Sequence, residues 1–414
     1  MRLAMFTNKF PIKGDTFFAR DLRALMEAGI TVDVFPMHPI DETAWQWIPE
    51  ILNEKYFRRE QVRETRPADF VSFPRGSGVA GALRFAGDAA RVTASALSFG
   101  GGPAAKSAYA LGVAWAWAAR YGGSYDHMMS YWGNFAATCA HVAHRLAGRD
   151  IPLSMLLHAG TDLYRNQVFM EEKLRYADNI FVVCDFNKEF LRTRFPALYP
   201  EIERKIQLHH LGLDFRELTF EREGRKENTV LCVGRFDRLK GFDYVLRAVK
   251  ALEARGIFAA VELVGDGDQG DALRALARES GMGDRVTFLG WRPFAEVQAA
   301  MKRATILVHA SADIGDAVPT VIKEATALGT PVIGTMVAGI PELLEYGTSG
   351  LLVPPRDVPA LADAIEKFLR DPALRDSYAR AARAYTERKF DLWTNGRLLA
   401  RRLESTTRST HGSL

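Results

Sequence analysis

The chain has 414 residues, which is more than one hydrophobic core commonly serves, so two domains are expected. Its net charge of +4 is too small an excess to indicate nucleic-acid binding, although an anionic substrate or membrane surface is compatible with it. Three widely spaced cysteines, no secretory leader and no long apolar run predict a cytoplasmic protein without disulfides, a zinc site or a transmembrane helix.

The first half of the chain alternates strands and helices. A strand over residues 2–7, a helix over 16–27 and a strand over 31–35 form a βαβ unit, which implies a parallel sheet. Residues 41–123 lack this alternation, and we expect helices with irregular loops there. The remaining strands expected in this sheet are 127–130, 152–157, 180–183 and 206–209, with helices between them. Residues 1–213 are therefore predicted to form a Rossmann-like domain.

The second half repeats the pattern after a polar, charged segment, 214–228, which we expect to be a linker. Residues 229–385 are predicted to form a second Rossmann-like domain. A helical segment over 386–404 is expected to pack back toward the first domain, and 405–414 to be a disordered tail. The expected strands of the second sheet are 229–233, 260–264, 286–289, 305–308 and 331–334. The fold class is thus α/β, with two facing doubly wound domains that bind ligands in the cleft at the carboxyl ends of their strands.

The segment GDGDQG contains the glycine spacing GxGxxG, at Gly265, Gly267 and Gly270, between a strand and a helix. A dinucleotide site also requires an acid near the end of the following strand, which here ends FLGW over residues 288–291 without one. A tight turn between strand and helix is favoured over a nicotinamide or flavin site.

The segment GRFDRLKG, residues 234–241, follows the first strand of the second half. Arg235 could hold a diphosphate as a planar fork and Lys240 as a point charge. The alternative is a solvated loop in which Asp237 neutralises a neighbour.

A further candidate site begins at Asp316, just before a helix predicted over 319–328. The start of a helix offers free N–H groups and partial positive charge, which suit a phosphate. Those groups belong to Ala317, Val318 and Thr320. Glu324 follows Asp316 by eight positions and could accept paired hydroxyls such as those of a ribose. The alternative for Glu324 is a solvated helix face, which its apolar neighbours disfavour.

His158 follows a strand in the first half, and Asp162 comes four residues later. A histidine at the carboxyl end of a strand, with an acid nearby, could contact a substrate, although a single histidine is often structural. The spacing matches no metal-binding motif.

The segment over residues 104–120, AAKSAYALGVAWAWAAR, is apolar, contains tryptophan and is flanked by Lys106 and Arg120. A buried core helix is the favoured interpretation. An interfacial membrane helix is the alternative.

Taken together, these segments resemble the retaining glycosyltransferases of family four, which have two Rossmann-like domains in the GT-B fold. The branch that builds colanic acid and related exopolysaccharides is the most similar. Residues 10–35 are similar to that family's opening loop and helix, and GRFDRLKG to its diphosphate-binding loop. AGTD after His158 resembles the HGxD loop, and HHLGLD resembles the domain-ending GxD. VGDGD, FLGW and GTPVIGT follow in the expected order, and Asp316 with Glu324 occupies the place of the two-glutamate motif.

The resemblance implies sugar transfer from a UDP- or GDP-sugar, with retention of anomeric configuration and with neither cofactor nor metal. The acceptor would be a saccharide or lipid-linked saccharide in cell-surface polysaccharide or glycolipid synthesis, made in the cytoplasm or at the inner face of the plasma membrane. The catalytic residues would be His158, Asp316, Arg235 and Lys240. The donor-binding residues would be Gly14, Asp15, Arg235, Lys240, Gly265, Trp291, Asp316, Ala317, Val318, Pro319, Thr320 and Glu324. Thr16 and Asp162 would bind the acceptor.

Two positions depart from the family pattern. Asp316 stands where glutamate is usual and is one methylene shorter, and Ala317 replaces the glycine that follows. A different donor sugar, or a water that bridges the gap, would accommodate both changes.

Other functions remain open on the sequence. A glycosyltransferase with a soluble acceptor, a nucleotide-sugar epimerase and a sugar phosphorylase could share the fold, and a non-catalytic sugar-binding protein could have two similar lobes. Nucleotide release on mixing donor with acceptor separates these classes.

Overall fold

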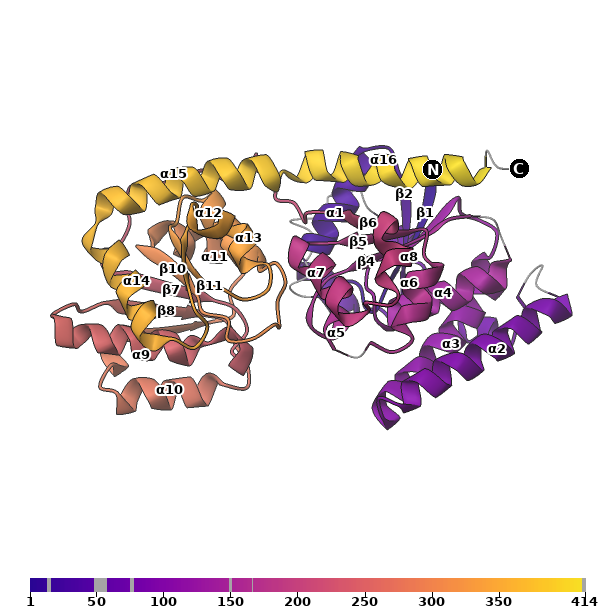
Figure 1. The fold of residues 1–414 in the computed structure, drawn as a ribbon, viewed down its shortest axis with the longest axis horizontal. Helices are drawn as coiled ribbons and strands as arrows, with labels where there is room; N and C mark the ends of the chain where they lie inside the picture. The colour runs from indigo at the N-terminus through magenta and orange to yellow at the C-terminus, as the bar shows by residue number, and fades with distance from the viewer. Residues whose placement is uncertain (13–15, 48–57, 75–77, 149–150, 166, 412–414) are drawn as a thin grey trace. The chain divides into compact units, whose positions relative to one another are not determined.

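The computed structural model describes residues 1–12, 16–47, 58–74, 78–148, 151–165 and 167–411. The chain divides into two compact units, one formed by Met1–Gly212 with Leu392–Leu414 and the other by Leu213–Asp391. Within each unit, helices flank a parallel sheet (Figure 1).

In the part of the first unit that is described, six parallel strands pair in the order β2-β1-β3-β4-β5-β6. Most of their residues are buried, as expected of a parallel sheet covered by helices. The strands are β1 (Arg2–Thr7), β2 (Thr31–Pro36), β3 (His127–Ser130), β4 (Leu153–Leu157), β5 (Asn179–Val182) and β6 (Ile206–Leu208).

The helices of the first unit include the region for which the sequence predicted helices and irregular loops, and that prediction is confirmed. They are α1 (Thr16–Glu27), α2 (Gly78–Leu97), α3 (Gly101–Tyr121), α4 (Phe135–Ala147), α5 (Gly160–Leu163), α6 (Met170–Tyr176), α7 (Asp185–Arg194), α8 (Tyr199–Ile202) and α16 (Leu392–His411). Short 3-10 turns are η1 (Glu42–Trp47), η2 (Arg59–Gln61), η3 (Pro67–Phe70) and η4 (Glu203–Lys205).

Helix α3 is a core helix along much of its length. Leu111, Val113 and Trp117 are buried in the hydrophobic core of the first unit, where Trp117 packs against Phe6 of β1. The favoured interpretation of residues 104–120 is therefore confirmed.

The carboxyl-terminal helix α16 packs against α1. Its last turns hold hydroxyls that bond to polar groups of the sheet: Thr407 Oγ1 lies 2.9 Å from His127 Nδ1, and Asn179 Nδ2 donates to Thr406 Oγ1 at 2.9 Å. The prediction of disorder from residue 405 is wrong for 405–411, because these polar side chains complete buried hydrogen bonds.

In the second unit, six described strands pair in parallel in the order β12-β11-β10-β7-β8-β9. They are β7 (Thr229–Val233), β8 (Ala260–Val264), β9 (Val286–Gly290), β10 (Ile306–His309), β11 (Val332–Thr335) and β12 (Leu351–Val353). The helices are α9 (Phe242–Leu252), α10 (Gly270–Glu279), α11 (Phe294–Arg303), α12 (Thr320–Ala327), α13 (Ile340–Leu343), α14 (Val358–Arg370) and α15 (Pro372–Lys389). The 3-10 turns are η5 (Arg238–Lys240), η6 (Glu253–Arg255), η7 (Gly283–Arg285) and η8 (Glu345–Gly347).

The polar segment 214–228 is part of the second unit, so its prediction as a linker is wrong. Phe215 and Leu218 are buried in that unit's core. Arg225 donates to the carbonyl of Ala304 at 2.9 Å, and Lys226 Nζ lies 2.8 Å from Glu262 Oε1. The charges that suggested a solvated linker are instead partners of groups in the second unit.

The strand orders place one switch of winding direction in each sheet. β1 lies between β2 and β3, and β7 lies between β8 and β10. Loops that leave the carboxyl ends of β7 and β10 therefore lie side by side, which is where doubly wound sheets bind ligands.

Candidate functional site

The loop after β7 carries the predicted pair Arg235 and Lys240. Asp237 organises it: its Oδ1 accepts from the backbone N–H groups of Leu239 and Lys240 at 3.0 and 3.1 Å, and so caps η5. Arg235 Nε donates to Asp237 Oδ2 at 2.8 Å. Asp237 thus neutralises a neighbour, as the alternative interpretation expected, while the Arg235 side chain stays 74% exposed and can reach a ligand.

Lys240 meets the loop after β10 directly. Its ammonium forms an ion pair with the carboxylate of Asp316. Burial alone would raise the pKa of Asp316, but the positive charge of Lys240, with a smaller contribution from Arg235, holds that pKa below its usual value. The structure therefore brings together three of the predicted residues, Arg235, Lys240 and Asp316.

Three residues that the sequence analysis did not single out hold the Asp316 loop. Buried His309 ends β10, and its Nε2 lies 4.0 Å from Asp316 Oδ2 and 3.0 Å from Ser311 Oγ. Thr335, which ends β11, donates its hydroxyl to the Ser311 carbonyl at 2.7 Å. Burial and the charge of Lys240 lower the pKa of His309 to about 3, so its imidazole is neutral at physiological pH. These three residues lie at or just after the carboxyl ends of β10 and β11, and that position is the sequence signal that could have identified them.

The glycines of the GxGxxG spacing form a tight turn beside this site. Gly265 has φ +140°, and a Cβ there would lie 1.8 Å from the carbonyl oxygen of Gly234. The loops after β7 and β8 also bond to each other, since Phe236 N donates to Asp266 O at 2.8 Å. The prediction of a strand-to-helix turn is confirmed, and Gly265 contributes by letting the backbone approach the loop of Arg235.

Helix α12 begins next to Asp316, at Thr320. Ala317 is buried, and its carbonyl accepts from Gly339 N at 3.0 Å, which fixes the approach to the helix. Pro319 is also buried, whereas Val318 and Thr320 are half-buried. The N–H group of Ile322 donates to the Pro319 carbonyl at 3.2 Å, while the N–H groups that precede it at a helix start have no partner within the helix and suit an anion.

Glu324 and Trp291 were also predicted to bind the donor. Glu324 lies in the second turn of α12 and is buried, so the alternative of a solvated helix face is wrong. Trp291 follows β9 and is exposed.

His158 of the first unit is enclosed by aromatic rings. It is 6% exposed, and its ring centroid lies 4.4 Å from Trp132, 5.1 Å from Tyr131 and 5.3 Å from Phe17. The distance from Nε2 to the Tyr131 carbonyl oxygen is 3.0 Å. Because a carbonyl only accepts, Nε2 carries a proton and the ring orientation is set.

Asp162 lies in α5, a short helix within the segment expected to be a loop. It is 2% exposed, and its carboxylate accepts from the backbone N–H groups of His158 at 2.8 Å and Asn134 at 3.1 Å. A carboxylate so enclosed positions the loops after β3 and β4. These bonds indicate a supporting role, and the acceptor contact expected of Asp162 stays a prediction.

A buried lysine completes the arrangement around Asp162. Lys173 Nζ donates to the carbonyl oxygens of Gly133 and Asn134 at 2.7 and 3.1 Å. Burial lowers the pKa of Lys173 to about 7, against the opposing charge of Asp162. Burial likewise raises the pKa of Asp162 to about 7, and hydrogen bonds from backbone N–H groups oppose that shift.

Thr16 is the first residue of α1 and is half-buried. Gly14 and Asp15, predicted to bind the donor, lie outside the described residues.

A second buried polar cluster ties α1 to the sheet of the first unit. Asp21 Oδ2 accepts from the hydroxyl of Tyr131 at 2.7 Å, and His209 Nε2 lies 2.8 Å from the same oxygen. Asp21 therefore joins α1 to the carboxyl ends of β3 and β6. Its partner Tyr131 is also one of the rings that pack on His158.

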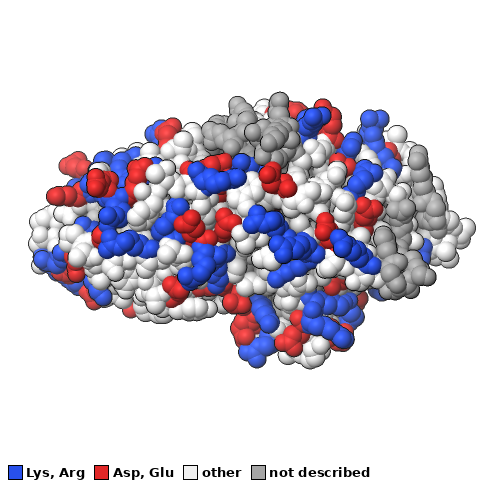
Figure 2. All heavy atoms as spheres, turned by 90° about the horizontal axis from the view of Figure 1, so that it is seen from above, with Lys and Arg blue, Asp and Glu red and all other residues white. Residues whose placement is uncertain are grey.

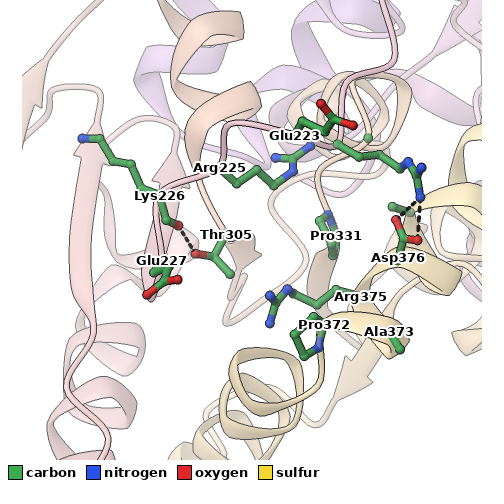
Figure 3. A pocket seen from close by; sticks show the side chains of 13 residues that line it. Glu223, Arg225, Lys226, Glu227, Thr305, Pro331, Pro372, Ala373, Arg375 and Asp376 are labelled. Atoms are coloured by element: carbon green, nitrogen blue, oxygen red, sulfur yellow. Dashed lines mark hydrogen bonds and ion pairs between the residues drawn. The ribbon is translucent and has the colours of Figure 1, made fainter.

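A cavity of about 480 Å³ lies at the opposite edge of the second sheet, where Thr305 and Pro331 precede β10 and β11. Figure 3 shows Arg225, Thr305 and Arg375 around it. Arg225 and Arg375 donate to backbone carbonyls there, so they anchor the segment 214–228 and α15. This cavity is separate from the site of Lys240 and Asp316.

In the described ranges, no three His, Cys, Asp or Glu side chains cluster as a metal ion would require, and no helix is long and apolar enough to cross a membrane. On the face seen in Figure 2, basic and acidic side chains are intermingled, which agrees with the small net charge.

The two parallel sheets and their flanking helices define the GT-B fold of glycosyltransferases. HepE of Anabaena, solved in complex with UDP-glucose, superposes with a TM-score of 0.69 over 98% of this chain and 100% of its own, at 18% identity. The fold class predicted from the sequence is confirmed.

Residues 215–385, which make up most of the second unit, match the family model described as "Glycosyl transferases group 1". Alpha-D-kanosaminyltransferase of Streptomyces kanamyceticus is 33% identical over 173 residues, 41% of this chain and 44% of that protein. The putative colanic acid biosynthesis glycosyltransferase WcaL of Salmonella typhimurium is 30% identical over 208 residues, 49% of this chain and 51% of that protein. The chain thus spans about half the length of these curated relatives.

Proposed function

We propose that this protein is a retaining glycosyltransferase that moves a sugar from a UDP- or GDP-sugar to a saccharide or lipid-linked saccharide. The observation that carries the proposal is the convergence of Arg235 and Lys240 with Asp316 where the winding of the second sheet reverses. The similarity to WcaL supports cell-surface polysaccharide or glycolipid synthesis, and the likeness to HepE supports a nucleotide-sugar donor.

The leaving diphosphate is the group that most needs stabilisation, because negative charge develops on it as the bond to the sugar breaks. The ammonium of Lys240 would exchange Asp316 for a phosphate oxygen, and the exposed fork of Arg235 would close on the other phosphate. The N–H groups at the start of α12 would add hydrogen bonds, and Glu324 would accept from the ribose hydroxyls.

The transfer breaks the bond from sugar C1 to the β-phosphate oxygen and forms a bond from C1 to the acceptor hydroxyl oxygen. The released phosphate oxygen takes the hydroxyl proton, so no separate base is needed. Lys240 and Arg235 supply the positive charge that a metal ion supplies elsewhere. Asp316 would turn to the donor sugar once Lys240 pairs with phosphate. His158, with its ring fixed by Tyr131 and Trp132, would orient the sugar.

We also propose that the protein works at the inner face of the plasma membrane through the outer surface of α2. Val79, Leu83 and Leu97 on this helix are 77%, 69% and 60% exposed. Arg84 and Arg91 are exposed beside them, whereas Asp88 is buried and paired with Arg91 and Arg145. Asp88 is shared between two arginines, so basic charge exceeds acidic charge beside the apolar face, which suits an anionic bilayer and would repel a second copy of itself.

A donor screen tests the main proposal. A nucleotide sugar that binds should raise the unfolding temperature, and at about 100 times its dissociation constant it adds about 2.7 kcal/mol. Mixing that donor with saccharide acceptors should then release the nucleoside diphosphate. Isomerisation of the donor without acceptor would indicate an epimerase, a requirement for free phosphate would indicate a phosphorylase, and binding without turnover would indicate a sugar-binding protein.

Membrane contact needs its own measurement. The protein should sediment with phosphatidylglycerol vesicles and not with phosphatidylcholine vesicles, and Leu83→Glu should weaken the binding. Equal binding to both vesicle types, or no effect of the substitution, would remove α2 as the contact surface.

A further inference from the structure

A cavity of about 510 Å³ opens in the first unit where β1 and β2 end. Lys9 and Phe10 line it from the segment after β1, and His38 and Pro39 line it from the segment after β2. Carboxyl ends of parallel strands are the edge at which doubly wound sheets bind ligands. The function proposed above places no group of the donor or acceptor in this cavity.

Lys9 lines the cavity, and Lys106 of α3 lies near its His38. Within the described residues, neither Lys9 nor Lys106 of α3 forms an ion pair, and both are exposed. The pKa of His38 is lowered mainly by burial and then by the positive charges of these two lysines, so both lie near its ring. The side chains of Lys9, His38 and Lys106 thus lie near one another, the first two from the segments after β1 and β2 and the third from α3.

His38 is held in place by Tyr109. Their rings stack with centroids 5.2 Å apart at an angle of 14°, and the Tyr109 hydroxyl donates to the Met37 carbonyl at 2.7 Å. A neutral imidazole fixed in this way can donate one N–H without adding a charge to neutralise.

Asp41 is the one carboxylate among the described residues that line the cavity, and it is turned toward the chain. Asp41 Oδ1 accepts from Thr43 N at 3.0 Å and from Thr43 Oγ1 at 2.6 Å, and those bonds lower its pKa. It remains charged and offsets part of the charge of Lys9. Lys106, near His38 but outside the cavity lining, adds a positive charge that Asp41 does not offset.

Apart from Thr43, the rest of the described lining is apolar. Phe10, Pro11 and Ala44 are buried there. Cations above an apolar wall suit a phosphate attached to a carbon skeleton.

We propose that this cavity is the acceptor's anionic subsite, which takes a phosphate or diphosphate group through Lys9 and Lys106, with His38 as a neutral donor. The inference rests on the proposed function for the identity of that group as part of the acceptor. The donor's diphosphate has its own cations, Arg235 and Lys240, in the second unit. A second set in the first unit therefore indicates a second anionic substrate.

Inorganic pyrophosphate is the probe, measured by calorimetry. Because pyrophosphate would also bind Arg235 and Lys240, the starting protein carries Arg235→Ala and Lys240→Ala. It should keep one pyrophosphate site. Adding Lys9→Ala and Lys106→Ala should weaken that site about tenfold or more, since each removes a charge-assisted hydrogen bond. Lys188→Ala, an exposed lysine of α7, is the matched control and should change nothing.

Undiminished pyrophosphate binding after Lys9→Ala and Lys106→Ala, or no binding before them, overturns the subsite. Lys9→Arg and Lys106→Arg, which keep the charge, should retain binding and so exclude a loss caused by misfolding. Nucleotide-sugar binding is measured separately on the unsubstituted protein, so failure of the proposed function is recognised independently.

Two further arms identify the source of the phosphate. Glucose 1-phosphate in solution represents a free sugar phosphate, and phosphatidylcholine vesicles containing a polyprenyl phosphate represent a lipid carrier. Binding of either that depends on Lys9 and Lys106 supports the subsite and assigns its source. Binding of neither contradicts it.

Discussion

The ammonium of Lys240 is paired with the carboxylate of Asp316, 76 positions later in the chain. The pair joins the loop after β7 to the loop after β10, and the next neighbour of Asp316 is the neutral imidazole of His309. A diphosphate that binds Lys240 has to compete with Asp316. Asp316 can therefore affect both donor affinity and the placement of the sugar.

Substitution of either donor-site cation should strongly reduce transfer. Lys240→Ala and Arg235→Ala should each lower kcat by about 10²-fold or more, because each removes a contact to charge that develops in the transition state. Nucleotide release assays measure the effect. Lys250→Ala is the control, because Lys250 of α9 pairs with Glu253 of η6 and not with a residue of the candidate site. Near-normal turnover in both site variants would reject the diphosphate assignment.

Asp316→Asn should alter donor kinetics. The substitution removes the charge that competes for Lys240, so the KM for the donor should fall. If the carboxylate acts on the sugar, kcat should also fall about tenfold, which corresponds to a loss of about 1.4 kcal/mol of transition-state stabilisation. Asp316→Glu lengthens the side chain by one methylene and should shift the preference among donor sugars. Unchanged kinetics for Asp316→Asn would exclude Asp316 from the site.

The sequence predicted much of the fold because its strands are apolar runs ended by glycine or polar turns. The bounds expected for β1, β3, β7 and β8 are confirmed. The segment 214–228 and the end of α16 were mispredicted because their polarity suggested solvent, whereas Arg225, Lys226 and Thr407 have partners in the folded units. Local composition cannot reveal partners that are distant in the chain.

The candidate site was predictable in part for the same reason. Strand-end loops next to a switch of winding direction are expected to meet, which anticipated Arg235, Lys240 and Asp316. No spacing rule indicated that Asp316 pairs with Lys240. His309 was missed because it ends an apolar strand. The burial of Asp162 was not foreseen because it arises from the loops after β3 and β4, which are distant in the chain.

Asp162→Asn should destabilise the protein without changing acceptor affinity. The amide would set an NH₂ group against backbone N–H donors, and an unmet buried hydrogen bond costs about 1–3 kcal/mol. The unfolding temperature should therefore fall, while KM values for donor and acceptor stay the same. Asp185→Asn, an exposed acid on α7, is the comparison variant. A raised acceptor KM with normal stability would restore a direct acceptor role for Asp162.

The buried histidine of the donor site should make stability depend on pH. The pKa of His309 is about 3 in the folded protein and about 6.5 in an unfolded chain, so the unfolded state binds the extra proton between these values. The contribution to stability is fully present above pH 6.5 and declines as the pH falls toward 3. At pH 5.5 the loss from His309 should be on the order of 1 kcal/mol relative to pH 7.5.

His309→Gln removes this titration while it keeps a polar group near Ser311 and Asp316. Its unfolding temperature should fall less steeply between pH 7.5 and 5.5 than that of the unsubstituted protein. Because His309 acts through Asp316, the same variant should shift kcat more than donor KM. His210 lies outside this site, so His210→Gln should leave the pH dependence of the second unit's unfolding temperature unchanged. An unchanged slope in His309→Gln would mean that His309 is not buried as a neutral group beside Lys240 and Asp316.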